Sequence, residues 1–166
     1  MIEQLPESGL VSAILAKETF SAADELARFA LSARGAGAIV SFQGIMRPDT
    51  KGGEPLERLV LEWHPRLTDI SLRQIAQAGA QRFATRAVTV VHRCGVVLPG
   101  EIIVLVAGAS DHRRDGFLAA DYLMDRLKTD AVFWKREEGA FGSRWIEPTQ
   151  KDQNDRMRWN HDQSPN

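Results

Sequence analysis

Apolar residues recur at helical and strand spacings along most of this 166-residue chain. The first helical pattern follows Ser21, a residue type that favours a helix N-terminus, and it ends at Gly35. Residues 36–43 then alternate between two sets of side chains, which predicts a strand buried on at least one face. One of these sets comprises Ala38, Val40 and Phe42.

The periodic pattern stops between residues 44 and 55. This stretch contains three glycines and two prolines, which do not continue a strand ladder, and it predicts a long, polar, mobile loop. A second strand is expected at about residues 56–63. Pro65 then opens a helix. Its predicted inward stripe consists of Leu72, Ile75, Ala76, Gly79 and Phe83.

Two hairpins are expected in the second half of the chain. Strands at 87–93 and 102–109 flank a Pro99-Gly100 pair suited to a type II turn, so we expect them to be antiparallel. Segments 132–137 and 143–147 favour a second hairpin. Between the hairpins, a helix capped by Ser110 or Asp111 should end near Thr129. Its predicted inward side chains are Phe117, Ala120, Met124 and Leu127.

The order of these elements mixes βα and ββ connections, which favours an α+β fold over a doubly wound one. We expect a mixed, largely antiparallel sheet and three main helices. No linker divides the pattern, so we expect one domain over residues 1–147. The polar residues 148–166 are expected to form a loosely held C-terminal tail.

Composition excludes several classes of protein. Hydrophobic residues are 43% and charged residues 26%, which is typical of a folded globular chain. The 21 basic side chains nearly balance the 22 acidic ones, which argues against nucleic acid or an anionic membrane as partner. The N-terminus lacks the features of an export signal, and the longest strongly apolar run, 102–109, is far below the ~20 residues of a membrane span.

The single cysteine, Cys94, excludes an intrachain disulfide and is interpreted as a small core residue without a catalytic role. Cysteine and histidine pairs at zinc-ligand spacing are absent from the sequence. A reducing cytoplasm fits this composition best. We expect neither a bound metal nor a membrane association.

Three groups of basic residues could carry chemistry. His112 and Arg113 lie at a strand-to-helix junction, where free backbone N–H groups and the helix dipole favour an anion such as phosphate. Lys128 and Lys135 flank a β-leaning segment. Partial desolvation would lower the pKa of a lysine there and make it competent as a base or nucleophile near neutral pH. Arg47 follows Gly44 at the root of the polar loop and offers a planar fork for phosphate. In each case the alternative is a solvated surface cation.

Five motifs in order resemble the molybdopterin synthase large-subunit family over residues 35–145. They are Phe42-Gln-Gly-Ile-Met-Arg47, Leu61-Glu-Trp-His-Pro65, Val91-His-Arg-Cys-Gly95, Ser110-Asp-His-Arg113 and Leu127-Lys-Thr-Asp-Ala-Val-Phe-Trp-Lys-Arg-Glu137. The resemblance implies an α/β-hammerhead-like fold. It also implies a sulfurtransferase that converts cyclic pyranopterin monophosphate to molybdopterin in molybdenum cofactor biosynthesis.

The same resemblance implies partners and site residues. The sulfur donor would be the thiocarboxylated Gly-Gly C-terminus of a small ubiquitin-like subunit, in a heterotetramer built on a large-subunit homodimer, and no cofactor would be needed. Lys128 and Lys135 match the family's catalytic lysines. The implied substrate-binding set is these two lysines with Ile45, Met46, Arg47, His112, Arg113, Arg136 and Glu137.

This chain departs from the family pattern at three positions. Ile45 stands where a basic residue is often found, Met46 where valine is common, and Val132 where a proline often precedes Phe-Trp-Lys. Two other functions stay open on sequence grounds. One is a non-catalytic α+β module that binds nucleic acid or another anion, and the other is a scaffold paralogue with the same fold.

Overall fold

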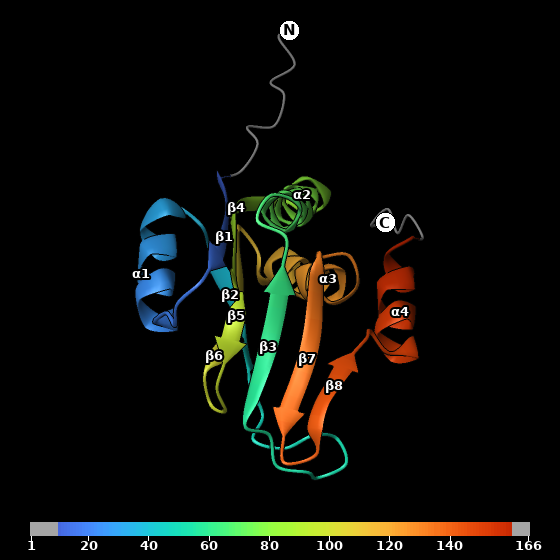
Figure 1. Cartoon of the computed structure of the whole chain (residues 1–166). Helices are drawn as coiled ribbons and strands as arrows, with labels where there is room; N and C mark the ends of the chain where they lie inside the picture. The colour runs from blue at the N-terminus through green and yellow to red at the C-terminus, as the bar shows by residue number, and fades with distance from the viewer. Residues whose placement is uncertain (1–9, 161–166) are drawn as a thin grey trace, which may run out of the picture.

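A computed structural model of the chain describes residues 10–160 (Figure 1). Residues 1–9, where the lack of an export signal was expected, lie outside the described residues. The last six residues of the expected tail, 161–166, lie outside them as well. The elements in chain order are β1 Leu10–Ala16, α1 Ala22–Ser32, β2 Ala38–Ile45, β3 Arg58–Trp63, α2 Leu67–Arg82, β4 Thr85–Arg93, β5 Gly95–Val97, β6 Ile102–Ser110, α3 Arg113–Thr129, β7 Phe133–Gly139, β8 Gly142–Ile146, α4 Gln150–Met157 and the 3-10 turn Arg158–Asn160.

The strands form two four-stranded sheets rather than a single one. The first sheet has the order β1-β4-β6-β2 and the second the order β5-β3-β7-β8. Only the β1–β4 pair is parallel among the strand pairs of the described residues. The predicted α+β class with a mixed, largely antiparallel arrangement is confirmed. The three main helices are accompanied by a short fourth one, α4.

The main core lies between the first sheet and helices α2 and α3. Leu72 and Ile75 of α2 and Leu123 of α3 pack there against the inner faces of β4 and β6. Helix α1 covers the opposite face of the first sheet through Phe29 and Ala33, as Figure 1 shows. The amphipathic helices expected from the pattern are therefore present, and burial of their apolar stripes stabilises this arrangement.

The predicted hairpin between β4 and β6 is confirmed, with Val90 opposite Val106. At its turn, the Glu101 N–H donates to the Leu98 carbonyl over 3.0 Å, and Gly100 has a φ of 86°, as a type II turn requires. The sequence did not predict β5, which interrupts this connection and pairs with β3. Three residues are too few to carry a periodic signal.

Strand β2 is less buried than predicted because it lies at an edge of the first sheet. Only the side chain of Val40 packs against the main core, and Phe42 is 45% exposed. The inward orientation predicted for Phe117 of α3 is wrong, since this ring is 62% exposed. Gly116 and Ala119 face the sheet instead, and their small size lets α3 approach β6 closely.

The loop between β2 and β3 is tied down, contrary to the expectation of a mobile segment. Met46 is 3% exposed and packs with Leu61 and Val97 between the two sheets. The Thr50 hydroxyl accepts hydrogen bonds from the backbone N–H groups of Gly52 and Glu54. These bonds replace a strand ladder and give the loop a fixed path.

The expectation of a loosely held C-terminal tail is wrong for residues 149–160. Thr149 and Asp152 form a capping box that starts helix α4, and this helix packs on α3. Trp159 lies edge-on to Phe83 and Tyr122. Strand β1 was also not predicted, and it adds the parallel edge of the first sheet. The division into a domain and a tail at residue 147 stays a prediction.

Candidate active site

Two lysines come together where the end of α3 meets the second sheet. Lys128 lies in the last turn of α3. Lys135 lies on β7, between Leu61 of β3 and Ile146 of β8. Burial lowers the pKa of Lys135, and the positive charge of Lys128 lowers it further. The structure therefore brings the two predicted catalytic lysines close enough for the charge of Lys128 to act on Lys135.

A buried histidine lies on the inner side of this lysine pair. His92 of β4 is 3% exposed and stacks on Phe133, the first residue of β7. Its Nδ1 lies 2.7 Å from the Arg93 carbonyl oxygen, so Nδ1 carries the proton and donates to it. Burial and then the charge of Lys135 lower its pKa to about 3. His92 is thus neutral near pH 7. Sequence reasoning quoted the Val91-His-Arg motif but assigned this side chain no role.

An acidic residue of the C-terminal segment completes the cluster. The Asp152 carboxylate lies 3.2 Å from the Lys128 ammonium. Partial burial of Asp152 alone would raise its pKa, but hydrogen bonds from Thr149 and the charge of Lys128 outweigh this effect and lower the pKa to about 2. Sequence reasoning missed Asp152 because it interpreted the whole segment as a tail. The available signal was the Thr149-x-x-Asp152 spacing of a capping box.

The three residues at the end of β2 lie in different environments. Ile45 is exposed at the strand end, while Met46 belongs to the core between the sheets. The backbone of Met46 is fixed on both sides, because its N–H donates to Glu101 and its carbonyl accepts from Gly100. Arg47 follows with an exposed side chain. Of the three, the structure thus leaves Ile45 and Arg47 available to a ligand.

His112 and Arg113 lie at the opposite end of α3 from Lys128. Both are exposed, and His112 is the N-cap residue of the helix. The fifteen-residue separation between Arg113 and Lys128 corresponds to about 22 Å along an α-helix. The register agrees, since the β6 end at Ser110 is opposite the β2 start at Ala38, far from Ile45. Within one chain, the predicted phosphate residues of this junction do not join the lysine pair.

Arg136 and Glu137 alternate on β7, so their side chains point to opposite faces of the second sheet. The Arg136 guanidinium forms ion pairs with Glu62 and Glu138 at 2.6 and 2.9 Å and lies over the ring of Trp145. This is the face opposite to Lys135. Glu137 shares the face of Lys135 and is half-buried.

An apolar groove runs between β2 and α3. Its volume is about 430 Å³. Met124 closes one part of its wall and lies one helical turn before Lys128, on the same side of α3. The Met124 wall of the groove is therefore one helical turn away from Lys128. It is lined by Val40, Ser41, Phe42, Phe117, Leu118, Ala120, Asp121 and Met124.

Metal-binding chemistry has no support in the part of the chain that the structure describes. No group of three or more histidine, cysteine or acidic side chains in that part could hold a metal ion. Cys94 is fully buried, and its burial raises the pKa of the thiol. Among residues 10–160, no helix is long and apolar enough to cross a membrane.

Comparison with known proteins identifies the family. The family model described as MoaE protein matches residues 15–130, which includes β2, α3 and Lys128. The chain belongs to the MoaE family. The predicted resemblance is therefore confirmed.

Relatives from several bacteria agree with this assignment. The chain is 48% identical over 126 residues to the molybdopterin synthase catalytic subunit of Caulobacter vibrioides, covering 76% of this chain and 82% of that protein. It is 41% identical over 123 residues to the protein of the same name from Escherichia coli K12, covering 74% and 81%. The chain is accordingly an enzyme of the molybdopterin synthase family, as predicted.

Solved structures share the fold. Molybdopterin cofactor biosynthesis protein E from Burkholderia multivorans has a TM-score of 0.76 at 32% identity, covering 92% of this chain and 98% of that one. Similarity extends to a complex of subunits 1 and 2 of molybdopterin-converting factor from Helicobacter pylori, with a TM-score of 0.65, 16% identity and coverage of 85% and 91%. The second similarity concerns the fold alone.

Proposed function

We propose that this MoaE family enzyme transfers sulfur from the thiocarboxylated C-terminus of a small partner protein to cyclic pyranopterin monophosphate, and so forms molybdopterin. The observation that carries the proposal is the pair of Lys128 and Lys135, in which the charge of Lys128 acts on the largely buried Lys135. A partly desolvated pair of cations stabilises negative charge that develops during an acyl-sulfur transfer.

In each transfer, the thiocarboxylate sulfur forms a bond to a carbon of the pterin precursor, and a carbon–oxygen bond at the same carbon breaks so that the oxygen leaves with its electron pair and takes up a proton. The bond between this sulfur and the partner's carbonyl carbon then breaks as water adds to the carbonyl, and the partner leaves as a carboxylate. Lys128 stabilises the charge on the carbonyl oxygen, and it carries protons between water and the leaving sulfur. Two such transfers supply both sulfur atoms of the dithiolene. The proposal assigns no metal or nucleotide to this step.

The groove between β2 and α3 suits the C-terminal tail of the partner. Its walls include Phe42, Phe117 and Met124, which offer apolar area to an extended chain. Two glycines at the end of such a tail carry no side chains and allow its terminal carbonyl group to come close to Lys128. The Helicobacter pylori structure of the same fold is a complex of two different subunits. This supports a small subunit as partner here.

We infer that a second copy of the chain completes the pterin pocket. About 22 Å separates Arg113 from Lys128 along α3, so one phosphorylated pterin cannot contact both ends of the same helix. A homodimer in which each copy brings His112 and Arg113 to the other's lysine pair resolves this separation. Trp134 and Trp145 are half exposed on the outer face of the second sheet and offer apolar area for self-association. With one small subunit on each copy, the assembly is a heterotetramer.

Replacement of Lys128 tests the catalytic assignment. Lys128→Ala should lower the rate of molybdopterin formation by about 100-fold or more, since a charge-stabilising group is lost. Lys17→Ala is the matched control, because Lys17 is an exposed lysine outside the site. Molybdopterin is measured after the reaction of purified enzyme with thiocarboxylated partner and precursor. A wild-type rate for Lys128→Ala would refute the proposal.

Mixing two inactive variants tests the shared pocket. If each site combines Lys128 of one copy with His112 of the other, a mixed dimer of Lys128→Ala and His112→Ala contains one intact site. Random mixing should then restore about a quarter of the wild-type rate. If both residues of a site come from the same chain, mixing restores nothing.

A further inference from the structure

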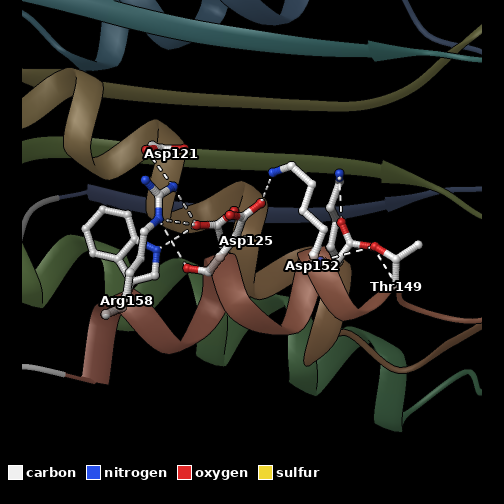
Figure 2. A network of polar contacts seen from close by, with 9 residues as sticks. Asp121, Asp125, Thr149, Asp152 and Arg158 are labelled. Atoms are coloured by element: carbon white, nitrogen blue, oxygen red, sulfur yellow. Dashed lines mark hydrogen bonds and ion pairs between the residues drawn. The ribbon is translucent and has the colours of Figure 1, made fainter.

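The C-terminal segment is fastened to α3 along its whole length. Asp125 of α3 is buried and accepts hydrogen bonds from the Arg158 guanidinium at 2.7 and 3.1 Å and from the Trp159 indole N–H at 2.7 Å. Directly after the last residue of α3, the Asp130 carboxylate accepts a hydrogen bond from the Arg156 guanidinium at 2.8 Å. Figure 2 shows Arg158 beside Asp121 and Asp125, just past the C-terminal end of α4. Helix α4 is thus held in a defined position next to Lys128.

At the other end of α4, one carboxylate performs two tasks. Asp152 Oδ2 accepts hydrogen bonds from the Thr149 N–H at 2.8 Å and the Thr149 hydroxyl at 2.7 Å, which completes the capping box. Its Oδ1 accepts from the Lys128 ammonium at 3.2 Å (Figure 2). The cap therefore fixes the rotamer of the same carboxylate that meets the lysine.

This fixed acceptor matters because a lysine side chain is long and flexible. The Lys128 side chain is 53% exposed, and an exposed ion pair between two mobile side chains contributes little. Asp152 is different, since its side chain is 17% exposed and already bound by the helix cap. An anchored acceptor restricts the positions of the ammonium without immobilising a second side chain.

Asp152 also acts on the second lysine. The charged groups that act on Lys135 are Lys128 from α3 and Asp152 from α4, while His92 of β4, whose pKa is lowered by Lys135, is neutral. The negative charge of Asp152 opposes the effects of burial and of Lys128 on the pKa of Lys135. Both lysines of the pair therefore depend on one residue of the C-terminal segment.

We propose that Asp152 is a positioning residue of the active site, which holds the Lys128 ammonium in place for sulfur transfer while its carboxylate caps α4. This inference rests on the proposed function. It makes one carboxylate of the C-terminal segment part of the active site.

The test is Asp152→Asn, which keeps a hydrogen-bonding side chain at the cap and removes the charge. Asp155→Asn is the matched control, since Asp155 is on the same helix and pairs with the exposed Lys151. Thr149→Val removes the cap hydroxyl and keeps the carboxylate. We expect Asp152→Asn to lower kcat about tenfold with little change in KM for the partner protein, because a misplaced group loses rate rather than binding. Asp155→Asn should retain the wild-type kcat, whereas Thr149→Val, which removes one of the two hydrogen bonds that anchor the Asp152 carboxylate, should lose only part of it.

A second measurement does not require turnover. The titration of Lys135 is followed by NMR of its side-chain carbon beside the ammonium, with Lys135→Arg used for assignment. Removal of the Asp152 charge should move the midpoint to lower pH, since this charge raises the pKa of Lys135. Asp155→Asn should leave the midpoint in place.

The outcomes separate the two proposals. An unchanged kcat and midpoint in Asp152→Asn would overturn the positioning role. An equal loss of kcat in Asp155→Asn would also overturn it, since removal of any negative charge from α4 would then account for the effect. If Lys128→Ala keeps full activity, the proposed function fails, whereas a shifted Lys135 midpoint in Asp152→Asn still establishes the electrostatic contact.

Discussion

The imidazole of His92 lies stacked on the ring of Phe133, with ring centroids 4.3 Å apart and planes inclined by 23°. This contact joins β4 of the first sheet to β7 of the second, and Phe133 lies two residues before Lys135 on the same face of β7. The imidazole therefore contributes to the junction of the two sheets as well as to the surroundings of Lys135.

The buried His92 predicts a specific loss of stability in acid. Its pKa is about 3 in the folded chain, below the value of 6.5 for an exposed histidine. The unfolded chain therefore binds the proton first, and the stabilisation present above pH 6.5 is lost as the pH falls toward 3. At pH 5 the loss from this residue should be about 2 kcal/mol. Urea denaturation at pH 7.5 and pH 5 measures it.

His92→Leu should remove this part of the acid sensitivity. His112→Gln, at an exposed position, should leave it unchanged. If the wild-type chain and His92→Leu lose the same free energy of unfolding between the two pH values, His92 is not the residue responsible.

Asp125 and Asp121 offer a comparison of a buried and an exposed partner of Arg158. Asp125 is buried and accepts three hydrogen bonds from the C-terminal segment, whereas the Asp121 side chain is 50% exposed. Asp125→Ala should lower the free energy of unfolding by about 2–3 kcal/mol, because it removes the buried charged acceptor of three hydrogen bonds from Arg158 and Trp159. Asp121→Ala should cost less than about 0.5 kcal/mol.

Limited proteolysis gives a local measure of the same effect. Cleavage within α4 should become faster in Asp125→Ala and stay slow in Asp121→Ala. Equal cleavage rates in the two variants would show that α4 is held by other contacts.

The groove between β2 and α3 predicts where the small subunit binds. Phe117→Asp places a charge on an exposed apolar ring of the groove, and it should raise the Kd for the small subunit by about tenfold or more. Leu31→Asp is the control, because Leu31 is equally exposed but lies on α1, on the other face of the first sheet. Isothermal titration with the purified partner measures both. Equal effects of the two variants would contradict the assignment of the groove.

Removal of metal ions should leave the reaction intact. The proposed transfer takes its sulfur from the partner and its charge stabilisation from Lys128 and Lys135. Enzyme dialysed against a chelator should therefore form molybdopterin at the same rate as untreated enzyme. Loss of activity that returns with one added divalent metal would require a different mechanism.

Much of the fold follows from local patterns in the sequence. The alternation in β4 and β6 and the Pro99-Gly100 turn predict the central hairpin, and the helical stripes predict α1, α2 and α3. Strand β1 was missed because its parallel pairing with β4 spans about 75 residues of sequence, and nothing local specifies such a partner. Helix α4 is almost wholly polar, and the contacts of Asp125 that hold it depend on tertiary structure.

In the candidate site too, some features follow from the sequence and others depend on tertiary structure. The motifs predict Lys128 and Lys135, and the structure brings these two together. The separation of His112 from Lys128 could have been derived earlier, since a helix starting after Asp111 and ending near Thr129 must place them at opposite ends. The contributions of His92 and Asp152 could not be derived, because burial and neighbouring charge depend on how distant elements pack.

The position of α4 bears on the synthesis of the enzyme. Residues 149–159 follow all the strands and the three longer helices, so they are the last of the described elements to leave the ribosome. A nascent chain that has not reached them can already pair its strands and bury its core, yet it lacks the carboxylate that meets Lys128. Catalytic competence therefore depends on the element of the described fold that is synthesised last.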